Sequence, residues 1–175
     1  MASTYTWKKD NGTQTGSPTA GTTRATATET NWKSIDDNST AFTAAPVIAG
    51  NNSYEVWLSG EWGGTYSNIF SVLWAHTAGT IPTGTTLKGI RGIAYTTPST
   101  AANANLTVDM SSAIAIGLGQ SVNVGGTSPQ AAGKAASTSA NPAYTEFLTT
   151  QLQTISSATQ GDSSVITETL QWNEN

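Results

Sequence analysis

Cysteine, histidine and charged residues are all scarce in this chain. Among its 175 residues there is no cysteine and one histidine, and only 10% are Asp, Glu, Lys or Arg, against about 25% in a typical soluble domain. Without cysteine there are no disulfides or thiolates, and a single histidine excludes the usual zinc-ligand sets. Ionised side chains are the usual means of acid–base catalysis. We therefore expect no enzyme: no catalytic residues, no cofactor and no metal.

A basic stripe and a long hydrophobic run are also missing. The net charge is −4, and of the seven Lys and Arg residues only Lys8 and Lys9 are adjacent, which argues against binding to nucleic acid. No run approaches the ~18 apolar residues of a membrane span. The first residues lack the basic-then-apolar layout of a signal peptide. We expect a soluble product made in the cytoplasm, without a membrane partner.

What the chain does contain changes along its length. Residues 1–45 are rich in Thr, Gly and Ala, with three aromatic residues before Phe42, namely Tyr5, Trp7 and Trp32. Such a segment buries little by itself. It is predicted to be an extended N-terminal arm or loop region, which either ties the subunit to a neighbour or is a loose terminus. Residues 46–175 are predicted to form the folded domain.

Alternation of apolar and polar residues predicts β-strands from residue 54 onward. In Tyr54–Gly60 one face carries Tyr54, Val56 and Leu58, and a turn is expected at Glu61–Gly64. Further strands are expected at 68–75, 87–97, 106–110, 113–116, 120–124 and 165–172, and a surface loop at 125–142. Residues 144–156 fit either a helix or a strand, and their many threonines favour a strand. The predicted fold is all-β, an antiparallel β-sandwich or jelly roll.

Three sets of polar residues are candidates for sites of chemistry. His76 has no recognisable nucleophile motif around it and is best explained as a surface or hydrogen-bonded residue at a strand end. Glu55 and Glu61 could be imagined as a glycosidase pair, but solvated carboxylates explain them as well. Asp36–Asn38 lacks the spaced ligands of a dedicated calcium loop, which favours an exposed acidic turn.

Aromatic residues remain as candidates for contact with other molecules. Trp57, Trp62 and Trp74 fall in neighbouring predicted strands or their turn, where they could form a sugar-binding platform or the core. Trp74 is predicted to be core, whereas the glycines after Trp62 favour a surface position. An exposed Trp is a good interface anchor. The predicted interface residues are Tyr5, Trp7, Lys8, Lys9, Trp32 and Trp62.

Six stretches of the chain have a familiar sequence: Ala49–Trp57, Asn68–Gly79, Thr86–Gly89, Thr97–Thr100, Thr150–Thr154 and Leu170–Asn175. These stretches resemble virion proteins of tailed bacteriophages. The resemblance covers most of the chain, is greatest for capsid decoration (cement) proteins, and carries no catalytic residues. It implies a structural protein with a β-sandwich fold, located in the virion.

The leading expectation from sequence is therefore a homo-oligomeric decoration protein. It would bind the major capsid protein or other virion proteins, and bridge and stabilise capsomers. The alternatives are a tail component (a tube, head–tail adaptor or fibre subunit) and a glycan- or receptor-binding module.

Overall fold

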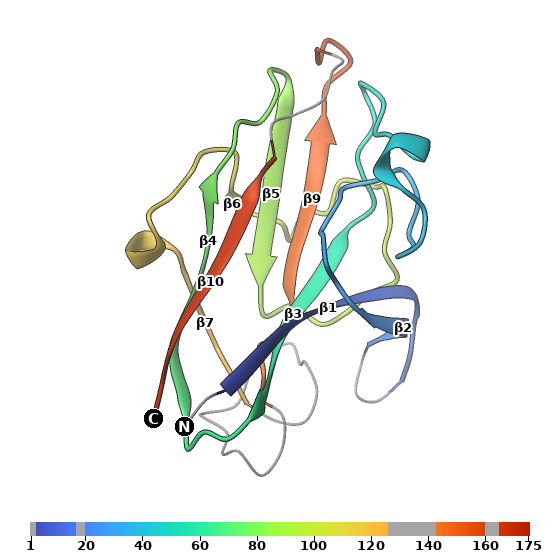
Figure 1. The fold of residues 1–175 in the computed structure, drawn as a ribbon. Coiled ribbons are helices and arrows are strands. Elements are labelled where there is room, and N and C mark those ends of the chain that lie inside the picture. Colours follow the sequence, from blue (N-terminus) through green and yellow to red (C-terminus); the bar gives the residue numbers. More distant parts are fainter. Residues whose placement is uncertain (1–2, 17–19, 126–142, 160–164) are drawn as a thin grey trace.

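Two antiparallel β-sheets pack face to face in the protein (Figure 1). The computed structural model describes residues 3–16, 20–125, 143–159 and 165–175. Every strand pairing in these parts is antiparallel. The all-β sandwich predicted from the alternating pattern is confirmed.

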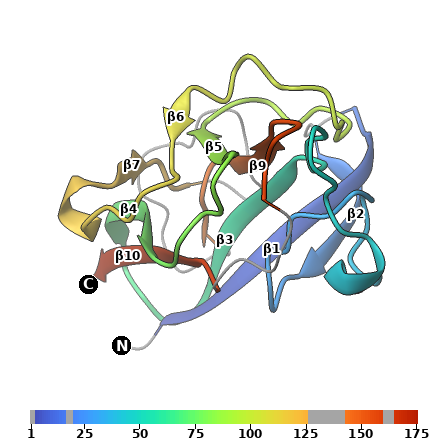
Figure 2. The same ribbon diagram turned by 90° about the horizontal axis from the view of Figure 1, so that it is seen from above.

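In the described part of the chain the large sheet has seven strands. Six follow the order β2-β1-β3-β9-β5-β6, and the seventh, β8, also pairs with β3. Its strands are β1 (Ser3–Gln14), β2 (Gly21–Thr26), β3 (Val56–Gly64), β5 (Thr85–Arg91), β6 (Val108–Asp109), β8 (Ala143–Tyr144) and β9 (Leu148–Thr154). The small sheet has the order β10-β4-β7 and comprises β4 (Ile69–Ala78), β7 (Gln120–Val122) and β10 (Thr167–Glu174). Figure 2 shows the small sheet along one side of the molecule. Two 3-10 helices, η1 (Phe42–Ala44) and η2 (Ile116–Leu118), lie in the connections.

The N-terminal segment is not an arm that projects from the sandwich. β1 pairs with β3 along eight residues and with β2 on its other side, so both strands belong to the large sheet. The reason is aromatic packing: Tyr5 stacks on Trp172 of β10 at 4.9 Å between ring centroids and lies 5.2 Å from Trp62 of β3. The other alternative, a loop region, applies to residues 27–45 of the segment. They belong to the connection 27–55, which contains η1 and no strand.

Most predicted strands are present, with shifted ends. The strand expected at 54–60 is β3, which continues through the predicted turn to Gly64, and the ambiguous segment 144–156 contains strands β8 and β9 and no helix. The strand expected at 87–97 ends at Arg91 as β5, followed by Gly92 at φ 75°. The expected strand at 113–116 is wrong, since η2 begins at Ile116. Of the loop expected at 125–142, all but Gly125 lies outside the described residues.

A β-bulge in β4 decides which of its side chains face inward. Gln171 of β10 pairs with Leu73, but Asn173 pairs with Phe70, so β4 has one extra residue in this interval. Ser71 has φ 53° there, the only positive value at a described non-glycine residue. The extra residue reverses the alternation. Val72 and Ile69 therefore both point into the core, while Phe70 is 42% exposed.

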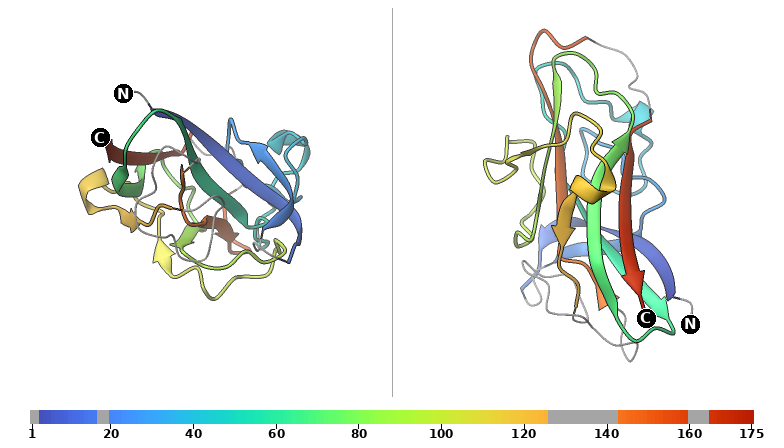
Figure 3. Two further views of the ribbon diagram at one scale, coloured as in Figure 1. Left: turned by 90° about the horizontal axis from the view of Figure 1, so that it is seen from below. Right: turned by 90° about the vertical axis from the view of Figure 1, so that its left-hand side faces the viewer.

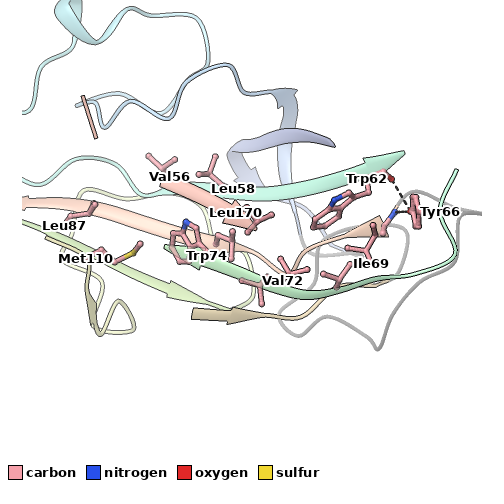
Figure 4. Packing of buried hydrophobic residues seen from close by; sticks show 14 residues of the cluster. Val56, Leu58, Trp62, Tyr66, Ile69, Val72, Trp74, Leu87, Met110 and Leu170 are labelled. Atoms are coloured by element: carbon pink, nitrogen blue, oxygen red, sulfur yellow. Dashed lines mark hydrogen bonds between the residues drawn. The ribbon is translucent and has the colours of Figure 1, made fainter. Parts of the chain in front are cut away.

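The main core fills the space between the sheets. Figure 4 shows Trp62, Trp74 and Leu170 among the inward side chains. Their cluster includes Val56 and Leu58 of β3, which lie on the face predicted from the alternation. A smaller cluster on the opposite face of the large sheet contains Trp57, Tyr95 and Phe147. β3 is thus buried on both faces.

Candidate interaction surface

One end of the sandwich contains a groove between β10 and the segments that follow β2. Its volume is about 980 Å³, at the upper end of the ~300–1,000 Å³ typical of ligand pockets. Leu58 of β3 and Leu152 of β9 contribute to it from the large sheet, and residues 27–32, 42–43 and 46–49 line it from the connecting loop. The upper part of Figure 1 contains these segments, and the right-hand view of Figure 3 shows β4 and β10 side by side.

Large hydrophobic side chains are exposed at this groove. Val165 is 86% exposed, Ile48 57% and Phe42 46%, and all three line it. Trp7 and Trp32 also line it and are half-buried. Single exposed apolar residues are ordinary, but a group of them around one concave surface is typical of an interaction site.

The charged residues that line the groove are all acidic. Glu29 is exposed on its wall, Glu168 of β10 also lines it, and no Lys or Arg does so in the described part of the chain. Both carboxylate oxygens of Glu168 are buried and have no hydrogen-bond partner. Burial raises the pKa of this carboxyl to about 7. The neighbouring indole N–H of Trp74 lowers that pKa by a smaller amount, but lies outside hydrogen-bonding geometry.

His76 lies opposite Glu168 in the β4–β10 pairing and is fully buried. Its Nδ1 is 2.6 Å from the carbonyl oxygen of Met110, and its Nε2 is 2.7 Å from that of Ala78. A carbonyl oxygen only accepts, so both contacts are hydrogen bonds only when both ring nitrogens carry a proton. The ring joins β4 to the segment after β6. The position of His76 agrees with the expectation of a hydrogen-bonded histidine near a strand end, although its side chain lies in the interior and not on the surface.

The predicted interface residues do come together, but not as one exposed patch. Trp62 is fully buried in the core, which corrects its expected surface position: β3 extends through the glycines that were expected to form a turn. Lys9 is buried and donates to the backbone oxygen of Asp37, while Lys8 forms an ion pair with Glu61 at 3.5 Å. Tyr5, Trp7 and Trp32 pack partly buried against the core. Of the six, only Trp7 and Trp32 line the groove.

The other acidic candidates have structural partners. Glu55 is buried and accepts from Asn103 and from the indole of Trp57. It lies six residues from Glu61 in extended chain, about 20 Å away at a strand's rise per residue, whereas glycosidase carboxylates lie roughly 5–9.5 Å apart.

Asp36 and Asp37 hold a loop against the large sheet. Asp37 accepts from Lys33 Nζ at 2.6 Å, and this contact is the main reason that the pKa of Asp37 is lowered. Asp36 accepts from the side chain of Asn11 and the backbone N–H of Gly12. Within the described ranges no group of three or more His, Asp or Glu side chains is placed to hold a metal ion.

The sequence analysis missed the groove residues Phe42, Ile48, Val165 and Glu168. Glu168 could have been recognised from the alternation, because it is an acidic residue on the apolar face of the predicted strand, which is formed by Ile166, Leu170 and Trp172. The exposed hydrophobic residues could not be recognised in this way, since they lie outside the strands, in two connections that are far apart in the sequence.

Comparison with protein-family models, with curated proteins and with solved structures gave no match. No helix in the described part of the chain is long and apolar enough to span a membrane.

Proposed function

We propose that the protein is a structural component of a tailed-bacteriophage virion, and specifically a homo-oligomeric decoration protein that binds the major capsid protein and stabilises capsomers. The observation that carries the proposal is the group of exposed hydrophobic side chains, Phe42, Ile48 and Val165, around a single groove at one end of the sandwich. Apolar surface of this kind is a favourable contact when a partner covers it. The resemblance of the sequence to phage decoration proteins supports the virion as the assembly in which the protein acts.

The scarcity of charge supports the same role. With charged residues at 10% of the chain, little electrostatic repulsion opposes close contact between neighbouring subunits. A decoration protein is present in many copies on one surface, so each contact can be weak while the assembled layer is stable. A catalytic role is not part of the proposal.

Copy number and position in purified particles test the proposal. We expect hundreds of copies per virion by quantitative mass spectrometry, and density for the sandwich on the outer capsid surface by electron microscopy. A few copies, or a few dozen, at the tail would identify an adaptor or fibre subunit instead. Absence from particles would contradict a virion role altogether.

A glycan-binding module is the second candidate, favoured by two half-buried tryptophans and an exposed carboxylate in the groove. Aromatic faces and carboxylates are suited to the apolar faces and hydroxyl groups of sugars. Glycan-array binding that is lost in Trp32→Ala would support this candidate. Trp62→Ala, suggested by the sequence alone, is unsuitable for the test because Trp62 is part of the core.

A further inference from the structure

Within the described residues, one edge of β10 is not paired with another strand. β10 pairs with β4 along one edge, and among the described residues its other edge has no β partner. An unpaired strand edge presents backbone N–H and C=O groups in the spacing that another extended chain needs. Proteins commonly block such edges with Lys or Pro, and β10 contains neither.

The free part of this edge coincides with the groove. Towards its C-terminal end β10 lies against β1, where Ser3 Oγ donates to Glu174 and Trp172 stacks on Tyr5. Towards its N-terminal end, residues 165–168 line the groove. An extended chain that paired there would therefore place alternate side chains between β10 and the loop of residues 27–49.

The charges of the groove indicate what such a chain carries. Glu29 is exposed on the groove wall, the buried Glu168 ionises as the pH rises through its pKa of about 7, and no basic residue of the described chain lines the groove. A second copy of this edge would add carboxylates to carboxylates, which is unfavourable. A Lys or Arg would compensate the acidic wall and could lie over Trp7 or Trp32, whose faces attract cations.

We propose that the groove receives an extended segment of the capsid protein, which pairs with the free edge of β10 and presents apolar side chains and one Lys or Arg to the groove. This inference rests on the proposed function for the source of the segment. The backbone pairing provides affinity, and the groove selects the side chains, as in other cases of β-strand addition.

A synthetic peptide tests the pairing without the virion. The probe is seven residues long, acetylated and amidated, with Val at its second and sixth positions, Lys at its fourth and Thr elsewhere, so that Val and Lys share one face. We expect saturable binding by calorimetry and slower amide hydrogen exchange in residues 166–169. Glu in place of Lys should weaken binding at least tenfold. Methylation of the backbone nitrogens on the pairing side should abolish it.

A matched pair of protein variants locates the site. Val165→Asp places a charge at the lip of the groove and should weaken peptide binding at least tenfold. Leu118→Asp, at a residue that is 79% exposed in η2, should change it less than twofold. No binding at millimolar peptide, or equal losses in the two variants, would overturn the inference. So would a dimer of the purified protein that Val165→Asp dissociates, because the occupant would then be a second copy.

Binding to capsids that lack the protein separates this inference from the proposed function. Particle binding that survives Val165→Asp would leave the decoration role intact and refute the groove as its attachment site. Peptide binding without particle binding would keep the pairing and refute the capsid protein as the partner. Loss of particle binding in Val165→Asp but not in Leu118→Asp is the result expected if both proposals are right.

Discussion

At the scale of single residues, Glu168 is the described side chain with two buried polar atoms that lack a hydrogen-bond partner. Its carboxylate oxygens are buried without a hydrogen bond, on a strand whose neighbouring inward residue, Leu170, is core. Ionising a buried carboxyl is unfavourable unless a partner compensates the charge. The folded protein therefore keeps the proton of Glu168 to a higher pH than the unfolded chain does.

Glu168 should make folding stability depend on pH in a predictable direction. Its pKa is about 7 in the fold and 4.5 for the unperturbed group, so between these values the folded state binds more protons. The stabilisation of the fold by the proton on Glu168 is fully present below pH 4.5 and is lost as the pH rises through about 7, with a maximum near 3 kcal/mol. In denaturant titrations, Glu168→Gln should raise the free energy of unfolding at pH 8 relative to wild type, and not at pH 4.

Burial also raises the pKa of Asp10 and of Glu55, so they too contribute to the pH dependence of stability. Their contributions cancel in the difference in unfolding free energy between Glu168→Gln and wild type, which isolates that of Glu168. Glu29→Gln is the matched control at an exposed residue of the same groove, and should change stability by less than about 0.5 kcal/mol at either pH. A Glu168→Gln effect that did not vary between pH 4 and pH 8 would contradict the assigned ionisation.

Trp62 and Trp32 were both predicted from the sequence as interface residues, but their substitution should affect the free energy of unfolding to different extents. Trp62 is fully buried, and Trp62→Ala should cost about 3–5 kcal/mol of unfolding free energy. Trp32 is half-buried and donates to Thr150 Oγ1 at 3.1 Å, so Trp32→Ala should cost less, about 1–2 kcal/mol. Equal costs in urea titrations would refute the assignment of one to the core and the other to the groove wall.

At the scale of elements, the bulge in β4 makes Ser71 a sensitive position. A β-branched residue is strained at positive φ, so Ser71→Val should destabilise the protein by about 1–2 kcal/mol. Ser71→Gly should be neutral or slightly stabilising, because glycine adopts this conformation without strain. Ser121→Val is the control, at an exposed residue of the neighbouring strand β7. Thermal unfolding of the three variants gives the comparison, and a harmless Ser71→Val would show that the bulge is not fixed.

The bulge also explains where sequence reasoning failed. The period-two pattern was sufficient for the type of β3 and β10, because alternation follows directly from strand geometry, but it did not identify β1, which was expected to be part of an arm. The pattern did not reveal the bulge in β4, which places Ile69 inward and leaves Phe70 exposed. The groove could not be predicted for a related reason. Phe42 and Ile48 come from the connection between β2 and β3, Val165 comes from the one between β9 and β10, and only the packing of the sheets brings them together.

At the scale of the whole molecule, the N-terminal strands close one side of the sandwich. A composition poor in large apolar residues suggested that residues 1–45 bury little by themselves and form an arm or loop region. Yet Tyr5 and Trp7 are enough to anchor β1, since they pack against the main cluster while the rest of the strand pairs with β3. A few aromatic residues on one face of a strand can thus outweigh the composition of the segment.

Deletion of residues 1–26 should consequently unfold the protein and not merely detach it from its partners. The deletion removes β1 and β2, leaves one edge of β3 unpaired and uncovers Trp62 and Trp172. We expect loss of a cooperative thermal transition and aggregation through the newly exposed edge. Because aggregation can have other causes, Tyr5→Ala provides a milder test in the intact chain. It should lower the unfolding free energy by about 3 kcal/mol, while Thr4→Ala at the neighbouring exposed position should cost less than 1 kcal/mol. A truncated chain that stayed monomeric and melted cooperatively near the temperature of the full protein would restore the idea of a dispensable arm.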